Sequence, residues 1–332
     1  MNAKSEVKDM EQYDKENLKK PLSGIVPPLV TPMLDSDQLD VAGLERLIEH
    51  VVGGGVHGLF ILGTTGEAPN LSYRLRREVI DRTCTMVRGR VPVIVGITDT
   101  SMVEAVKLAR HAEMAGAQAV VTAAPYYFPI GQPELLEWVE HLLPKLPLPL
   151  YLYNMPEMTK VQFEPRLIQQ LTQLEGIAGL KDSSGDLDYF KQLVEIAKAR
   201  PDWRVFIGPE HLLVEAMRLG GHGGVNGGAQ IDPGLFIRIY EAMLRGDYVT
   251  VKQLHAKLLN LGAVYRVGKY AYAVIKGIKC ALNLMGICSG EMVEPMRAFN
   301  EPERRIIAEK LITLGLLHKP IPAIADSTLV LE

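Results

Sequence analysis

The segments LYLYNMP (residues 150–156) and GLKDSSG (179–185) are two short apolar runs that each end at a reactive side chain. The first run ends at Tyr153 and the second at Lys181. Apolar runs of four to six residues, separated by a stretch of helical length, are typical of parallel strands joined by crossover helices. These two segments therefore predict neighbouring strands whose ends carry a phenol and an amine.

The same alternation extends across most of the chain. We predict eight strands, at 24–30, 58–62, 91–96, 119–122, 148–153, 177–181, 204–207 and 223–225. Amphipathic stretches of helical length follow them, at 41–52, 74–87, 102–115, 133–143, 165–171, 187–199, 211–219 and 233–244. Eight strand–helix units predict a closed (β/α)8 TIM barrel of the α/β class. A doubly wound sheet is the alternative, but no Gly-x-Gly-x-x-Gly fingerprint follows the first strand.

The sequence predicts three regions. Residues 1–22 are charged and predict a flexible N-terminal tail or arm, with a weak helix at 7–18. Residues 23–246 would form the catalytic barrel. Residues 247–332 contain further helical patterns without a strand signal. Because no linker rich in Pro, Gly or Ser separates this last region, we expect a C-terminal helical extension packed on the barrel.

Composition favours small-molecule chemistry. The 36 basic and 39 acidic residues give a net charge of -3, so we expect no nucleic acid and no anionic membrane as partner. No apolar run of 18 residues is present, and the charged N-terminus predicts neither a signal peptide nor an anchor. Three irregularly spaced cysteines are too few for a disulfide framework or a zinc cluster, and they fit a cytoplasmic location. No H-E-x-x-H pairing supports a metal site.

In a barrel, the carboxyl ends of the strands converge on one mouth, where catalytic residues gather. Burial disfavours the charged form of an amine, so Lys181 could form a Schiff base with a ketone while Tyr153 transfers protons. For a single lysine, a solvated strand end is the commoner role. Asp182 could be a charge partner of Lys181, although a solvated acid after a strand is more common.

The segment GTTGE (63–67) is a glycine-flanked turn with two hydroxyl groups. Its backbone N–H groups with Thr64 and Thr65 could hold a carboxylate; a plain tight turn in which Thr65 caps the next helix is the alternative. Glu67 could orient this turn, or could be a carboxylate stabilised at a helix N-terminus.

Two further loops follow predicted strands. The aromatic loop APYYFP (124–129) favours packing or a subunit contact for Tyr126 and Phe128. The glycine-rich segment 220–228 leaves room for a ligand or for close backbone approach. It contains no Lys or Arg, which argues against a phosphate cradle.

The motifs GTTGE (63–67), PYY (125–127), YN-x-P (153–156) and GLK (179–181), in this order, resemble the dihydrodipicolinate synthase and N-acetylneuraminate lyase family of class I aldolases. The resemblance spans roughly residues 24–317. It implies a (β/α)8 barrel that binds a 2-oxo acid of the pyruvate type as a Schiff base on Lys181. The turn that begins at Gly63 and contains Thr64 and Thr65 would hold the substrate carboxylate, and no metal or organic cofactor would be required.

The resemblance also implies roles for further residues. Tyr153 would be the proton relay, supported by Thr64 and Tyr127. In the family, the residue that matches Tyr127 reaches across a dimer interface into the neighbouring site. The usual assembly is a tetramer built from two dimers, so we expect a homotetramer. Gly208 and Val225 match the glycine after strand seven and the strand-eight residue that packs near the lysine.

The sequence departs from the synthases at Met158. There an arginine binds a substrate carboxylate, and a thioether cannot form a bidentate ion pair. We therefore predict a lyase that makes or cleaves a carbon–carbon bond next to pyruvate, with a sugar acid or another 2-oxo acid as the longer substrate. Two alternatives remain open. One is dihydrodipicolinate synthase itself, with carboxylate recognition supplied by another residue, and the other is a non-catalytic barrel that binds 2-oxo acids.

Overall fold

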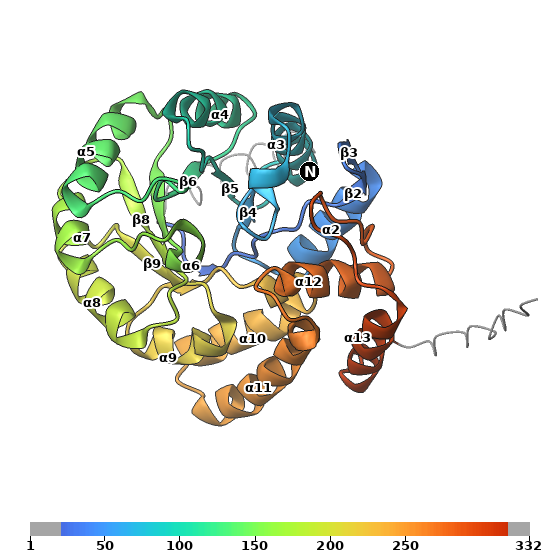
Figure 1. Ribbon diagram of the computed structural model, residues 1–332. Helices are drawn as coiled ribbons and strands as arrows, with labels where there is room; N and C mark the ends of the chain where they lie inside the picture. The colour runs from blue at the N-terminus through green and yellow to red at the C-terminus, as the bar shows by residue number, and fades with distance from the viewer. Residues whose placement is uncertain (1–20, 318–332) are drawn as a thin grey trace, which may run out of the picture.

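The computed structural model describes residues 21–317 and contains the predicted barrel (Figure 1). Eight parallel strands form one sheet in the order β1-β10-β9-β8-β7-β6-β5-β4. A parallel bridge between Pro28 and Phe60 joins the segment after β1 to β4 and closes the ring. The strands are β1 (Gly24–Ile25), β4 (Leu59–Ile61), β5 (Val93–Gly96), β6 (Ala119–Ala123), β7 (Leu150–Asn154), β8 (Ile177–Asp182), β9 (Arg204–Ile207) and β10 (Gly223–Gly224). The TIM-barrel prediction is confirmed, and the doubly wound alternative is wrong.

The crossover helices surround the strands in Figure 1. Several begin at a side chain that accepts a hydrogen bond from the first turn, such as Asp40 from Gly43 N–H and Asp232 from Leu235 N–H. Their bounds lie close to the predicted ones, except that α9 is shorter than the predicted stretch 211–219. These helices are α2 (Val41–Gly53), α3 (Tyr73–Val87), α4 (Met102–Met114), α5 (Gln132–Leu142), α7 (Pro165–Leu171), α8 (Leu187–Ala197), α9 (Leu213–Arg218) and α10 (Pro233–Leu244).

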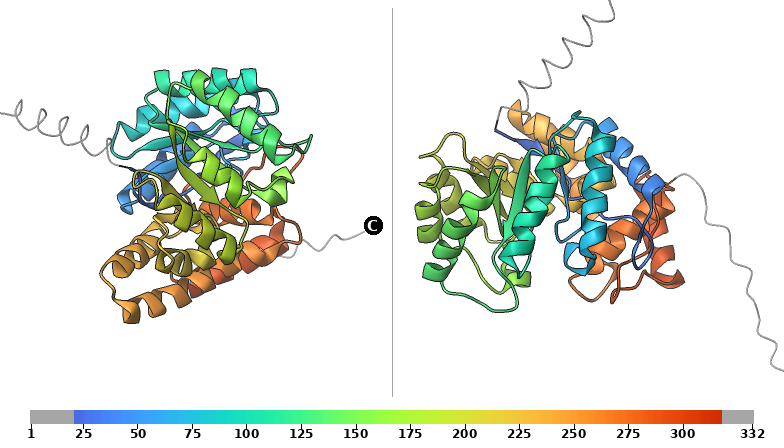
Figure 2. Two further views of the ribbon diagram at one scale, coloured as in Figure 1. Left: turned by 90° about the vertical axis from the view of Figure 1, so that its left-hand side faces the viewer. Right: turned by 90° about the horizontal axis from the view of Figure 1, so that it is seen from above.

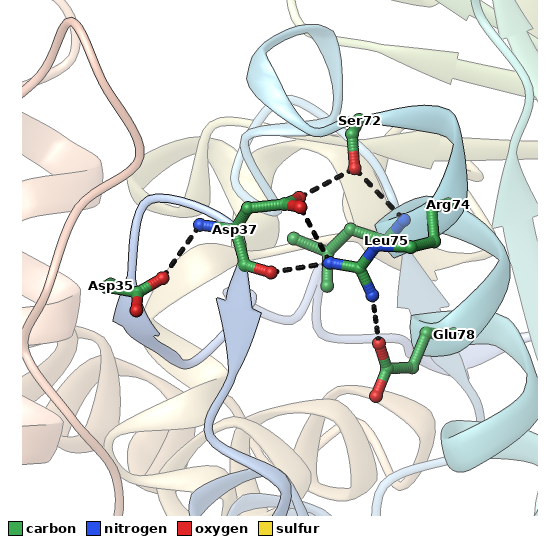
Figure 3. A network of polar contacts seen from close by, with 6 residues as sticks. All are labelled: Asp35, Asp37, Ser72, Arg74, Leu75 and Glu78. Carbon is green, nitrogen blue, oxygen red and sulfur yellow. Dashed lines mark hydrogen bonds and ion pairs between the residues drawn. The ribbon is translucent and has the colours of Figure 1, made fainter.

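A small antiparallel hairpin of β2 (Met33–Asp35) and β3 (Gln38–Leu39) precedes α2, and the sequence did not predict it. Strands of two and three residues are too short to show an alternating pattern. Figure 3 shows how the hairpin meets the start of α3: Asp37 accepts hydrogen bonds from Ser72 and Arg74 at 2.7 and 2.8 Å. These donors lower the pKa of the Asp37 carboxyl. Because the network is exposed, it orients the hairpin more than it stabilises the fold.

The described C-terminal elements are α11 (Tyr248–Leu261), the 3-10 helix η5 (Gly262–Val267), α12 (Ala273–Leu284) and α13 (Glu301–Thr313). They lie against one side of the barrel, next to α10 and α2 (Figures 1 and 2). Leu254 and Leu258 of α11 are buried, as their spacing in the sequence predicts. The predicted helix at 7–18 and most of the predicted tail fall outside the described residues. Among residues 21–317, no helix has the length and apolar character needed to cross a membrane.

Candidate active site

A cavity of about 570 Å³ lies at the carboxyl ends of the strands. Loops after β4, β7, β8, β9 and β10 form one part of its wall, and α11, η5 and α12 form another. Most of the predicted site residues border it, namely Thr64, Thr65, Tyr153, Met158, Lys181, Gly208 and Val225.

Lys181 and Tyr153 are partners across two neighbouring strands, because the register of β7 and β8 places them opposite each other. Lys181 is only 7% exposed. Its Nζ lies 4.1 Å from the centre of the Tyr153 ring and 5.2 Å from that of Phe60. Aromatic faces at these distances partly replace water around an ammonium group. The amine thus lies in an aromatic pocket with direct access to the cavity.

The Tyr153 hydroxyl connects this amine to the threonine turn. It lies 3.4 Å from Thr64 Oγ1, and either oxygen can be the donor. Burial raises the pKa of the Tyr153 phenol. The positive charge of Lys181, with hydrogen bonds from Thr64, Ser183 and Lys181, outweighs burial and holds this pKa below its ordinary value. A phenol whose anion is stabilised in this way can accept and return a proton near neutral pH.

The threonine turn after β4 has a strained backbone. Leu62 and Glu67 both have a positive φ, 57° and 55°, which is uncommon for residues other than glycine. Between them, Gly66 N–H donates to Gly63 O at 3.1 Å. A Cβ on Gly63 would come within 2.6 Å of the Phe60 ring, so Gly63 lets the turn pack on that ring and does not itself border the cavity. Strain of this kind persists only where the surroundings enforce it.

Glu67 provides one such constraint. Its side chain is completely buried and forms an ion pair with Lys279 of α12, which is also completely buried. Glu67 Oε2 accepts a hydrogen bond from Val293 N–H at 2.9 Å, and Lys279 Nζ donates to Glu291 O at 2.7 Å. The interpretation of Glu67 as a helix-terminal carboxylate is wrong, because its side chain caps no N–H group of the following 3-10 helix. It ties the turn to the C-terminal helices instead.

Asp182 neither pairs with Lys181 nor faces solvent. It is buried, and its carboxylate accepts hydrogen bonds from Asn154 Nδ2 at 2.8 Å and from Ser184 N–H at 3.0 Å. Burial raises the pKa of Asp182, while these hydrogen bonds oppose the rise. The prediction of a solvated acid is wrong, since Asp182 fastens the ends of β7 and β8 on the side of the strand opposite to Lys181.

Glycines near the site permit close approach. A Cβ on Gly208 would come within 2.0 Å of Ser183 Oγ, so this glycine makes room for a hydroxyl that borders the cavity. Gly223, in the glycine-rich segment, has a φ of 143°, and a Cβ there would come within 1.9 Å of Gly24 O. Gly223 therefore serves the pairing of β10 with β1, which is the close backbone approach that the sequence predicted as one alternative.

Tyr127 does not border the cavity of its own chain. It is 81% exposed with a φ of 78°, and its ring packs edge-on against Phe128, which is 74% exposed. This pair forms an aromatic projection on the surface. A role of Tyr127 in the site of a neighbouring chain remains a prediction.

The sequence missed the residues that close the far side of the cavity. Glu210 Oε2 accepts a hydrogen bond from Gly228 N–H at 2.8 Å, and its Oε1 is buried. Burial raises the pKa of Glu210 to about 7, although the hydrogen bonds from Gly228 N–H and the Tyr265 hydroxyl lower it. Tyr265 and Arg266 reach the cavity from η5. No strand ends near Tyr265 or Arg266 in the sequence, so the strand-end rule gave no signal for these two residues.

Within the described range 21–317, no group of three or more His, Cys, Asp or Glu side chains is placed to hold a metal ion. The site offers an amine, a phenol and hydroxyl groups instead. A buried lysine beside a phenol at the carboxyl end of a closed (β/α)8 barrel is the arrangement typical of enzymes that use an amine nucleophile. The sequence profile of the Dihydrodipicolinate synthetase family matches residues 21–313. The chain belongs to this family, and the prediction of a carbon–carbon lyase is confirmed.

Similar proteins carry more than one name. The chain is 34% identical, over 77% of its length and 86% of the other, to the "Probable 2-dehydro-3-deoxy-D-pentonate aldolase YjhH" of Escherichia coli (strain K12). A solved dihydrodipicolinate synthase from Bacteroides thetaiotaomicron is 51% identical, with a TM-score of 0.86 over 89% of this chain and 99% of that one. YagE, a family member from E. coli K12 solved in complex with pyruvate, is 29% identical over 89% and 99% of the two chains, with a TM-score of 0.84.

Proposed function

We propose that this enzyme forms a Schiff base between Lys181 and pyruvate, and makes or cleaves the adjacent carbon–carbon bond of a longer 2-oxo acid. The observation that carries the proposal is the contact of the Lys181 amine with Tyr153, whose hydroxyl lies 3.4 Å from Thr64 Oγ1. A pyruvate-bound relative supports pyruvate as the common substrate.

Each residue would have a defined task. The neutral Lys181 amine attacks the ketone carbon of pyruvate. Tyr153 donates its proton to the departing oxygen, so that water leaves, an iminium ion forms and Tyr153 becomes a phenolate. The hydroxyl groups and N–H groups of Thr64 and Thr65 would hold the pyruvate carboxylate. Tyr153 would then accept a proton from the methyl carbon, which converts the iminium ion into an enamine. This step requires no metal or organic cofactor.

The enamine carbon would attack the carbonyl carbon of an aldehyde, and Tyr153 would return the proton to the new alkoxide. Hydrolysis of the iminium ion by water releases the product and regenerates Lys181. In the cleavage direction the same steps run in reverse. The aldolase similarity favours a sugar acid or another 2-oxo acid as the longer substrate. Exposed Met158 borders the cavity without supplying a charge.

A second candidate function is that of dihydrodipicolinate synthase, with pyruvate and aspartate semialdehyde as substrates. The 51% identity to a protein with that name favours it. Because the thioether of Met158 cannot form an ion pair with the second carboxylate, this candidate requires another residue to bind that group. Turnover of aspartate semialdehyde, compared with turnover of hydroxylated aldehydes, distinguishes the two candidates.

We further propose a homotetramer, as a dimer of dimers, in which the Tyr127–Phe128 projection lies in an interface. The exposure of both rings supports this, since aromatic side chains are enriched in interfaces. A cytoplasmic location is proposed from the three free cysteines of the described chain. Mass measurement by light scattering tests the assembly, and cell fractionation tests the location.

The decisive experiment is borohydride reduction in the presence of pyruvate, followed by intact and peptide mass spectrometry. Reduction converts an imine into a stable adduct, and we expect one adduct per chain, on Lys181. Peptides containing Lys160, on the same side of the barrel, are the internal control and should stay unmodified. Absence of an adduct on folded protein would contradict the pyruvate imine. Trapping with longer 2-oxo acids would then identify a different carbonyl substrate. If no adduct forms with these either, the non-catalytic barrel that binds 2-oxo acids is the remaining alternative.

A further inference from the structure

The wall that the C-terminal helices contribute to the cavity is mostly apolar, with two tyrosines and one arginine among its residues. Its residues include buried Leu258 and Ile275 and partly exposed Leu259 and Val274. Arg266, from η5, is the one charged side chain on this wall. A substrate whose far end reaches this wall would find one cationic partner there, so an anionic end group would fit.

Arg266 is available for a ligand. None of the ion pairs found among residues 21–317 includes it. The side chain is exposed at the edge of the cavity, and one guanidinium nitrogen lies about 3.5 Å from the position of a Cβ on Gly262, another residue of the wall. A partly hydrated arginine keeps its charge at every physiological pH and presents a fork of N–H donors.

The acids around the cavity do not neutralise Arg266. Glu67 is paired with Lys279. Burial raises the pKa of Glu210 to about 7, so this carboxyl is partly neutral at neutral pH. Glu157, on the short helix α6 (Pro156–Thr159) outside this wall, is the remaining acid that lines the cavity and is exposed. The far half of the cavity is therefore suited to an anionic end group and not to a cationic one.

On the basis of the proposed function, we propose that Arg266 binds a terminal anionic group of the second substrate. The aldehyde that the enamine attacks carries a carboxylate or phosphate at its far end, and the condensation product is a 2-oxo acid with two anionic ends. The threonine turn holds one end and Arg266 the other. Arg266 thus determines specificity and takes no part in bond formation.

Three aldehydes of the same carbon number test this inference. D-Glyceraldehyde has a neutral far end, tartronate semialdehyde has a carboxylate there, and D-glyceraldehyde 3-phosphate has a phosphate. Each is condensed with pyruvate by the wild-type enzyme and by Arg266→Gln, and kcat/KM is measured from pyruvate consumption. Loss of a charged hydrogen-bonding partner typically lowers kcat/KM by about 10-fold to 100-fold. We expect this loss for an anionic aldehyde and a change below about threefold for D-glyceraldehyde.

Two variants serve as controls. Lys269→Gln removes one positive charge from the same exposed segment without touching the cavity wall, so it should leave all three rates unchanged. Arg266→Lys keeps the charge but loses the fork, so it should recover part of the activity toward the anionic aldehyde. The two anionic aldehydes distinguish carboxylate recognition from phosphate recognition.

The inference fails independently of the proposed function. Suppose that pyruvate is trapped on Lys181 in both the wild-type enzyme and the Arg266→Gln variant. If the variant then lowers the rates with all three aldehydes equally, or lowers none of them, Arg266 does not recognise an anion. If the wild-type enzyme prefers D-glyceraldehyde, the inference is also wrong. If no pyruvate is trapped on Lys181, the proposed function itself fails.

Discussion

Replacing Lys279 by methionine would break the buried ion pair that ties the threonine turn to α12. Methionine fills a similar volume, but it leaves the Glu67 carboxylate completely buried with a single donor, Val293 N–H. Removal of one partner from a buried pair typically costs about 3–5 kcal/mol of the free energy of unfolding. In a chain longer than 250 residues, 1 kcal/mol shifts Tm by about 2 °C. We therefore expect Lys279→Met to lower Tm by roughly 6–10 °C.

A double-mutant cycle measured by thermal unfolding tests this reasoning. Glu67→Gln keeps an acceptor for Val293 N–H, and its cost should be smaller because burial already lowers the pKa of Lys279 and favours its neutral form. The double variant contains no buried charge, so we expect it to be more stable than Lys279→Met alone. If the two single effects simply add, Glu67 and Lys279 are not coupled and the argument is refuted. Pyruvate trapping on each variant shows whether the turn also loses carboxylate binding.

Three further predictions concern the site. Lys181→Ala should abolish turnover while the circular dichroism spectrum and Tm stay close to wild type; strong residual turnover would exclude the imine. Tyr153→Phe should lower kcat by about 100-fold or more with little change in KM, since general acid–base catalysis is typically worth about 10²–10⁴-fold; an effect on KM alone would mean that Tyr153 only binds substrate. Because the pKa of Glu210 is raised from 4.5 to about 7, its neutral form stabilises the fold fully below pH 4.5, and this stability is lost as pH rises through 7. The Glu210→Gln variant should therefore become more stable than wild type as pH rises from 5 to 8, by up to about 3 kcal/mol of unfolding free energy, which appears as a higher Tm. Parallel curves of Tm against pH for the two proteins would mean that Glu210 titrates normally.

The alternation of strands and helices predicted the barrel because the barrel strands are largely buried on both faces and are thus mainly apolar. The same property explains why strand ends could be found: Tyr153 and Lys181 are the first reactive groups after an apolar run. Short elements were less predictable. The β2–β3 hairpin has five strand residues in all, and the two residues of β10 owe their place to glycines that let β1 approach.

Side chains with the expected chemistry were found more easily than their partners. Lys279 lies in an amphipathic helix, where a lysine ordinarily faces solvent. Only the fold shows that it meets Glu67, which lies 212 positions earlier in the chain (279 − 67). The sequence likewise contains no sign of the environment of Glu210. Burial raises its pKa to about 7, and the hydrogen-bond partners that oppose this rise, Gly228 and Tyr265, are distant in sequence. Pairings of this kind depend on three-dimensional packing that no local pattern encodes.

The arrangement of the cavity separates chemistry from recognition. Strand ends of the barrel supply the amine, the phenol and the threonine turn, whereas η5 and the helices beside it supply the opposite wall. Substitutions on that wall can change the second substrate without moving Lys181 or Tyr153. The Glu67–Lys279 pair limits this freedom, because α12 carries part of the wall and also anchors the catalytic turn. A change of specificity should therefore be tolerated at Arg266 in η5 and resisted at Lys279, where recognition and catalysis share one support.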